Sequence, residues 1–123
     1  MNVIIFGKPE ETAGAELSLK DLKEAGIEFL AEPSVCELER VAVRAEMILL
    51  DADAPGVSWQ YFVSRLRKLN PNLKIVLISC GTDNAAKAYE AGVFDYLLKP
   101  IKKMQLERVV AKYKTQSENE GLI

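Results

Sequence analysis

Short apolar runs alternate along the chain with longer segments in which apolar residues recur every three or four positions. Three of the runs, at residues 3–6, 47–50 and 75–78, are apolar throughout, which is typical of strands buried on both faces of a sheet. With two further runs they predict five strands, at residues 3–6, 27–31, 47–51, 75–78 and 94–98. The segments between and after these runs predict helices, because their apolar residues fall on one helical face.

This alternation predicts a parallel sheet, since parallel neighbours must be joined by crossover segments, which here are helical. Right-handed crossovers cover both faces of the sheet and give a doubly wound α/β fold. For five strands the common order is 2-1-3-4-5. In that order the binding crevice lies at the carboxyl ends of the strands, near the point between strands one and three where the order reverses.

Capping residues mark some of the helix boundaries. Ser58 is positioned to cap the third helix, and Thr82 or Asp83 the fourth. The apolar stripe of the last helix passes into a polar segment near the end of the chain. We therefore expect one domain over residues 1–115, followed by a polar tail or linker stub at 116–123.

With 123 residues and 13.7 kDa, the chain has the size of a single domain. Its 16 Lys and Arg against 18 Asp and Glu give a net charge of −2, so no overall positive field favours nucleic acid or an anionic membrane. No segment approaches the ~18 consecutive apolar residues of a membrane span, and no signal-peptide pattern opens the chain. We expect a cytoplasmic protein that binds neither nucleic acid nor membranes through this domain.

Histidine is absent from the chain, which excludes zinc bound by histidine and nucleophiles activated by histidine. The two cysteines, Cys36 and Cys80, are too few for a disulfide framework, and we expect both to be buried as small apolar residues. The remaining chemistry must come from carboxylates, amines, hydroxyls or thiols.

Three polar residues of different chemistry stand at strand ends. Asp51 closes the second fully apolar run, Ser79 follows the third, and Lys99 follows the last predicted strand. Each residue taken alone is an ordinary loop former. Because the carboxyl ends of parallel strands meet at one edge of a sheet, the sequence predicts that an acid, a hydroxyl and an ammonium converge there.

The arrangement resembles the receiver domain of bacterial two-component response regulators, the CheY-like family. The resemblance extends from Asn2 to about Lys114 and rests on the order and spacing of several pieces rather than on one motif. These pieces are Ile48-Leu49-Leu50-Asp51 with Pro55-Gly56, Ile78-Ser79, Ala91-Gly92, and Tyr96-Leu97-Leu98-Lys99-Pro100. The resemblance implies the CheY-like, flavodoxin-like (βα)5 fold.

The resemblance also implies roles for individual residues. Asp51 matches the phosphoacceptor aspartate, Ser79 the hydroxyl residue that follows the phosphoryl group, and Lys99 the lysine that contacts it. Tyr96 matches the aromatic residue that changes rotamer on activation, although a half-buried strand tyrosine with its hydroxyl in water is an equally simple interpretation. Tyr96, Pro100 and the face formed by the fourth helix, last strand and last helix would bind a partner, either a sensor histidine kinase, another signalling protein or a second copy of the chain.

The sequence departs from the family at the end of the first strand. The family places an acidic pair there that helps to hold Mg²⁺, whereas this chain has Phe6 and Gly7. Magnesium requires near-octahedral oxygen coordination, for which Asp51 and Asp53 form at most a weak site. Without the pair, a direct ion pair with Lys99 is the simplest way to neutralise Asp51 in a drier pocket.

These observations favour a pseudo-receiver, a non-enzymatic module that acts through protein contacts with weak or absent magnesium-dependent phosphorylation. The alternative is an active response regulator that a sensor histidine kinase phosphorylates on Asp51. A third hypothesis is a small α/β enzyme with Ser79 or Cys80 as nucleophile. It is disfavoured because the sequence contains no nucleophile-elbow, P-loop or dinucleotide-binding motif.

Overall fold

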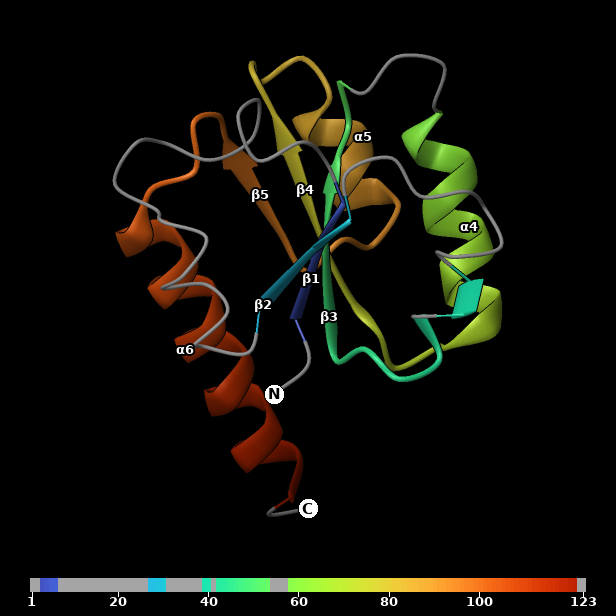
Figure 1. Cartoon of the computed structure of the whole chain (residues 1–123), viewed down its shortest axis with the longest axis vertical. Coiled ribbons are helices and arrows are strands. Elements are labelled where there is room, and N and C mark those ends of the chain that lie inside the picture. Colours follow the sequence, from blue (N-terminus) through green and yellow to red (C-terminus); the bar gives the residue numbers. More distant parts are fainter. Residues whose placement is uncertain (1–2, 7–26, 31–38, 41, 54–57, 122–123) are drawn as a thin grey trace.

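The computed structural model describes residues 3–6, 27–30, 39–40, 42–53 and 58–121. Its strands and helices are β1 (Val3–Phe6), β2 (Ile27–Leu30), β3 (Met47–Asp51), α4 (Trp59–Leu69), β4 (Lys74–Ser79), α5 (Ala85–Glu90), β5 (Asp95–Leu98) and α6 (Lys103–Gly121) (Figure 1). The first predicted helix lies outside the described residues, and the second is described only at residues 39–40 and 42–45, of which 39, 40 and 42 are helical.

The strands form one parallel sheet in the order β2-β1-β3-β4-β5, so the predicted fold class and strand order are confirmed. The register pairs Phe6 with Leu50, Asp51 with Ile78, and Ser79 with Leu98. The ends of β1, β3, β4 and β5 therefore lie next to one another along the carboxyl edge of the sheet.

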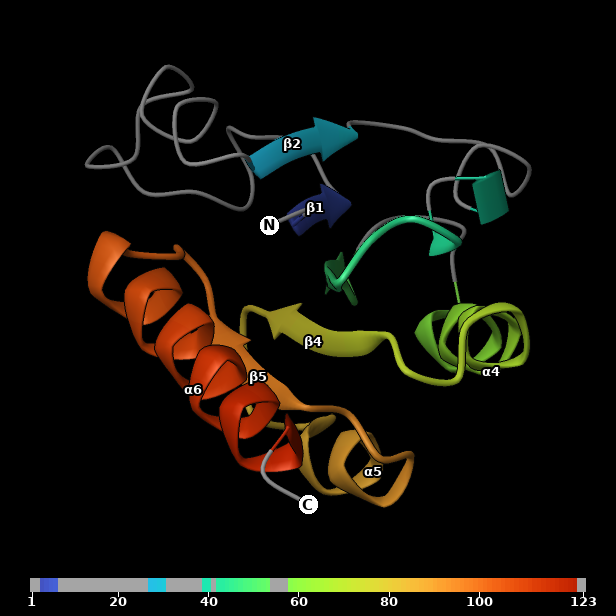
Figure 2. The same cartoon turned by 90° about the horizontal axis from the view of Figure 1, so that it is seen from below.

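Two apolar cores lie on opposite faces of the sheet. Figure 2 shows α4 and α5 on one side and α6 on the other. Alternate strand residues such as Ile48 and Leu50 pack with Phe62 and Leu66 of α4, whereas the residues between them pack with α6. Each fully buried Ile or Leu contributes about 1.5–3 kcal/mol of transfer free energy, which explains why the central runs contain no polar residue before the strand ends.

The helix boundaries agree only in part with the predicted caps. Ser58 caps α4 as predicted, since its hydroxyl accepts a hydrogen bond from the Tyr61 backbone N–H at 3.4 Å. The prediction for α5 was wrong: the cap position is held by Asn84 rather than by Thr82 or Asp83, and its side chain makes no capping hydrogen bond. Thr82 instead contributes its carbonyl oxygen to a turn that leads into the helix.

Helix α6 continues to Gly121, through the polar segment expected to form a tail. The segment contains Gln116, Glu118 and Glu120, and Gln and Glu are good helix formers even without an apolar stripe, so polarity alone does not end a helix. The domain boundary at residue 115 stays a prediction. In the described part of the chain, no helix is both long enough and apolar enough to cross a membrane.

Candidate functional site

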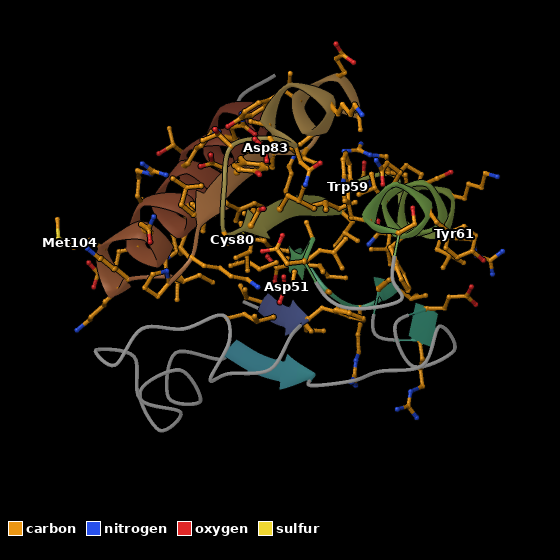
Figure 3. The ribbon with its side chains drawn as sticks, turned by 90° about the horizontal axis from the view of Figure 1, so that it is seen from above. Asp51, Trp59, Tyr61, Cys80, Asp83 and Met104 are labelled. Atoms are coloured by element: carbon orange, nitrogen blue, oxygen red, sulfur yellow. The ribbon has the colours of Figure 1, made fainter. Side chains whose placement is uncertain are left out.

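Asp51 is a buried carboxylate at the centre of the carboxyl edge (Figure 3). It is the last residue of β3, and only 1% of its surface is exposed. The strand pairing continues one residue further, because the Ala52 N–H donates to the Ile78 carbonyl oxygen at 2.8 Å. The backbone around the carboxylate is therefore fixed on the side of β4.

Lys99 forms the expected ion pair with Asp51. Its backbone N–H donates to the Ser79 carbonyl oxygen at 2.9 Å, which continues the pairing of β5 with β4. From this anchor its Nζ reaches Asp51 Oδ1 at 2.8 Å and Oδ2 at 2.9 Å. The ammonium thus contacts both oxygens of the buried carboxylate.

Asp53 is the member of the site whose role the sequence did not reveal. Its backbone N–H donates to Asp51 Oδ1 at 2.9 Å, which turns the loop back over the strand ends. Its carboxylate accepts hydrogen bonds from the Ser79 hydroxyl at 3.0 Å and from the Cys80 backbone N–H at 2.7 Å. It also lies 3.3 Å from Lys99 Nζ. An Asp-x-Asp sequence after a strand was the available signal, since Asp side chains commonly accept the N–H two residues on.

The electrostatics of the cluster favour charged side chains. Burial alone raises the pKa of Asp53, but hydrogen bonds from the Cys80 N–H, Ser79 and Lys99 outweigh it and bring the pKa below its usual 3.8. Burial alone lowers the pKa of Lys99, yet its hydrogen bonds and Coulomb attraction to Asp51 and Asp53 raise that pKa above 10.5. Asp53 and Lys99 are therefore ionised at neutral pH.

Tyr96 is linked to this cluster through the loop after β4. Its ring is half-buried against the core on the α4 side of the sheet, and its hydroxyl donates to the Gly81 carbonyl oxygen at 2.6 Å. One of the two interpretations placed this hydroxyl in water. In the structure it is instead hydrogen-bonded to the loop after β4. Pro100, which follows a cis peptide bond, is exposed.

The expected burial of Cys80 was wrong. Its side chain is exposed and its thiol is free, because it stands one residue beyond β4, where the chain leaves the sheet. The backbone N–H of Cys80 takes part in the site through its hydrogen bond to Asp53. Cys36 lies outside the described residues.

Residues 23–111 match the family model of the response regulator receiver domain. The chain belongs to the response regulator receiver domain family. The receiver fold is also that of a response regulator receiver domain protein from Clostridium thermocellum, which is 21% identical, with a TM-score of 0.72 over 95% of this chain and 96% of that one.

Two curated regulatory proteins are similar to this chain in sequence. The cyclic di-GMP phosphodiesterase response regulator RpfG of Xanthomonas campestris is 39% identical over 59% of this chain and 19% of its own length. The transcriptional regulatory protein BtsR of Escherichia coli is 31% identical over 65% of this chain and 33% of its own length. The chain therefore spans between about a fifth and a third of the length of these relatives.

Receiver domains use Mg²⁺ for phosphorylation, and the surroundings of the two carboxylates decide whether they suit this ion. Both oxygens of Asp51 contact an ammonium, and both oxygens of Asp53 accept hydrogen bonds from a hydroxyl or an N–H. At the end of β1, the Phe6 ring is buried and packs 5.6 Å from the Phe62 ring, where it supplies no oxygen ligand. Among the described residues, no three acidic or thiol side chains are grouped to hold a metal. As arranged, these side chains do not fit magnesium.

Proposed function

We propose that this receiver domain is a pseudo-receiver, which works in the cytoplasm as a non-enzymatic interaction module with weak or absent phosphorylation of Asp51. One observation carries the proposal: the ammonium of Lys99 contacts both oxygens of Asp51. A carboxylate that attacks a phosphoryl donor must present a free oxygen to it. Asp51, at 1% exposure, is both paired and covered.

The charge balance of the cluster supports the same proposal. Two carboxylates, Asp51 and Asp53, share the ammonium of Lys99. Phosphorylation would add negative charge to this group, and developing phosphoryl charge needs cations or several donors around it. The donors at Ser79 and Cys80 that could contribute are bound to Asp53.

The face formed by α5, β5 and α6 is suited to protein contacts. Each of its elements exposes one large apolar side chain: Tyr89 is 54% exposed, Leu98 42% and Met104 80%. Figure 3 shows Met104 pointing away from the ribbon. Exposed aromatic and methionine side chains are enriched at protein interfaces. We propose this face as the binding surface for a signalling partner or for a second copy of the domain.

The pseudo-receiver proposal is tested with a small phosphodonor. The protein is incubated with Mg²⁺ and acetyl phosphate, or with beryllofluoride, and followed by intact mass and by the NMR signals around Tyr96. We expect the treatment to leave the mass and the spectrum of the unaltered protein unchanged, as it should leave those of Asp51→Asn. Stoichiometric loading that requires Asp51 and shifts the Tyr96 signals would refute the proposal.

An active response regulator is the second candidate function. The observation that favours it is the convergence of Asp51, Ser79 and Lys99 at one edge of the sheet, as the family requires. In this case a sensor histidine kinase would phosphorylate Asp51, and the domain would bind Mg²⁺. Magnesium titration separates the two functions, because only the active regulator should show an affinity that Asp51→Asn abolishes.

A further inference from the structure

Three donors converge on the carboxylate of Asp53 from two segments that follow different strands. Ser79 Oγ and the Cys80 N–H come from the end of β4, and Lys99 Nζ comes from the residue after β5. A hydroxyl, a backbone amide and an ammonium can together bind the oxygens of a phosphate-like anion as readily as those of a carboxylate. We call these three donors the anion cradle.

We propose that Asp53 is the built-in ligand of the anion cradle and that it excludes phosphate and similar anions from these donors. Asp53 is thus a specificity-determining residue that decides whether the cradle accepts an external anion. This inference rests on the proposed function, since it names the group that competes with a phosphoryl group for Ser79, Cys80 and Lys99. It goes beyond that function because the Asp51–Lys99 pair does not explain what occupies the donors of Ser79 and Cys80, whereas Asp53 does.

The position of Asp53 is set by its tether to Asp51. The hydrogen bond from the Asp53 N–H to Asp51 Oδ1 turns the loop so that the Asp53 side chain falls over the end of β4. A group attached to the same chain has an effective concentration in the millimolar range or above. A free anion must therefore compete with the tethered Asp53 carboxylate at this high effective concentration. It must also replace the charge-assisted hydrogen bond of 2.7 Å from the Cys80 N–H to Asp53.

Exposure makes the exchange of ligands feasible. The Asp53 side chain is 28% exposed, whereas that of Asp51 is 1% exposed, so Asp53 stands between the cradle and solvent. Replacing Asp53 by alanine therefore opens the cradle to water without leaving a cavity inside the sheet. The Asp51–Lys99 pair, with contacts of 2.8 and 2.9 Å, does not depend on the Asp53 side chain.

The test measures binding of inorganic phosphate to Asp53→Ala at constant ionic strength, with chloride as the replacement salt. Binding is followed by the NMR shift of the Cys80 amide and by the thermal midpoint, neither of which needs covalent transfer to Asp51. We expect phosphate to shift the Cys80 amide in a saturable way and to bind at least about tenfold more tightly than to the unaltered protein. Asp83→Ala is the matched control, because it removes an exposed carboxylate from the loop between β4 and α5, beyond Cys80, and leaves the cradle donors in place.

A second variant confirms that the donors bind the phosphate. Asp53→Ala/Ser79→Ala lacks one donor of the cradle and should lose most of the gained affinity. If Asp53→Ala does not fold, Asp53→Asn keeps the side-chain volume, lacks the charge and should show the same gain in weaker form. The proposal is overturned if Asp53→Ala and Asp53→Asn bind phosphate no better than the unaltered protein, or if Asp83→Ala gains as much.

The outcome is independent of the phosphodonor experiment. Loading of unaltered Asp51 by acetyl phosphate would refute the pseudo-receiver, whatever the result at the cradle. Failure of Asp53→Ala to bind phosphate would refute the role of Asp53 and leave the pairing of Asp51 with Lys99 as the reason for low reactivity.

Discussion

Lys99 contacts both carboxylates of the site, so its removal should cost far more stability than the removal of Asp51. The two perturbations are Lys99→Met, which keeps an unbranched apolar side chain, and Asp51→Asn, which keeps the shape of the carboxylate. Lys99→Met leaves the Asp51 carboxylate, at 1% exposure, with a hydrogen bond from the Asp53 N–H. Asp51→Asn leaves Lys99 with Asp53 at 3.3 Å.

The magnitudes follow from these contacts. Breaking a buried ion pair by removing one partner costs about 3–5 kcal/mol, because the other charge stays buried without compensation. The lysine side chain is 14% exposed, so some water can reach the vacated space and the lower end of that range, about 3 kcal/mol, applies to Lys99→Met. Asp51→Asn should cost about 1 kcal/mol or less, since the amide oxygen can still accept the Asp53 N–H.

Urea denaturation at neutral pH measures both effects. With a slope of about 2 kcal/mol per molar urea, a loss of about 3 kcal/mol moves the midpoint down by about 1.5 M. In an Asp51→Asn/Asp53→Asn background, by contrast, Lys99→Met should lower the free energy of unfolding by only about 1 kcal/mol or less, because neither carboxylate is then present to be left unpaired. The reasoning is refuted if Asp51→Asn costs as much as Lys99→Met, or if the cost of Lys99→Met is the same in both backgrounds.

Two further predictions concern the groups around this pair. Tyr96→Phe removes the hydrogen bond to the Gly81 carbonyl oxygen and should lower the free energy of unfolding by about 1 kcal/mol in urea, while an unchanged value would mean that water replaces the hydroxyl. The folded-state pKa of Asp53 lies below 3.8, so the stability that it contributes is complete above that pH and is lost as pH falls through the lower value. Thermal midpoints measured from neutral pH down to acid should therefore fall more steeply for the unaltered protein than for Asp53→Asn.

The sheet and the Asp51–Lys99 pair were accessible from the sequence for the same physical reason. Apolar runs such as 47–50 and 75–78 can be buried only as central strands, and parallel strands bring their carboxyl ends to one edge. Once Asp51 and Lys99 share that edge, burial forces the acid to find a cation. Neither step requires knowledge of a side-chain rotamer.

The role of Asp53 and the exposure of Cys80 depend on loop geometry and could not be predicted in this way. A carboxylate two residues beyond a strand can point to solvent, to a metal or back onto the sheet, and the choice follows from the hydrogen bond between the Asp53 N–H and Asp51. The length of α6 is a different case, because its polar end has helix propensity without an apolar pattern to mark it.

The distances in the cluster separate the functions of its two carboxylates. Lys99 Nζ lies 2.8 and 2.9 Å from the oxygens of Asp51 but 3.3 Å from Asp53 Oδ2. The ammonium therefore interacts more strongly with Asp51 than with Asp53. Asp53 must then be satisfied chiefly by Ser79 and by the Cys80 N–H, at 3.0 and 2.7 Å. Loss of Lys99 therefore disturbs both carboxylates, whereas loss of Asp53 frees two donors and leaves the buried pair intact. Stability should depend mainly on Lys99, and access of anions to the site mainly on Asp53.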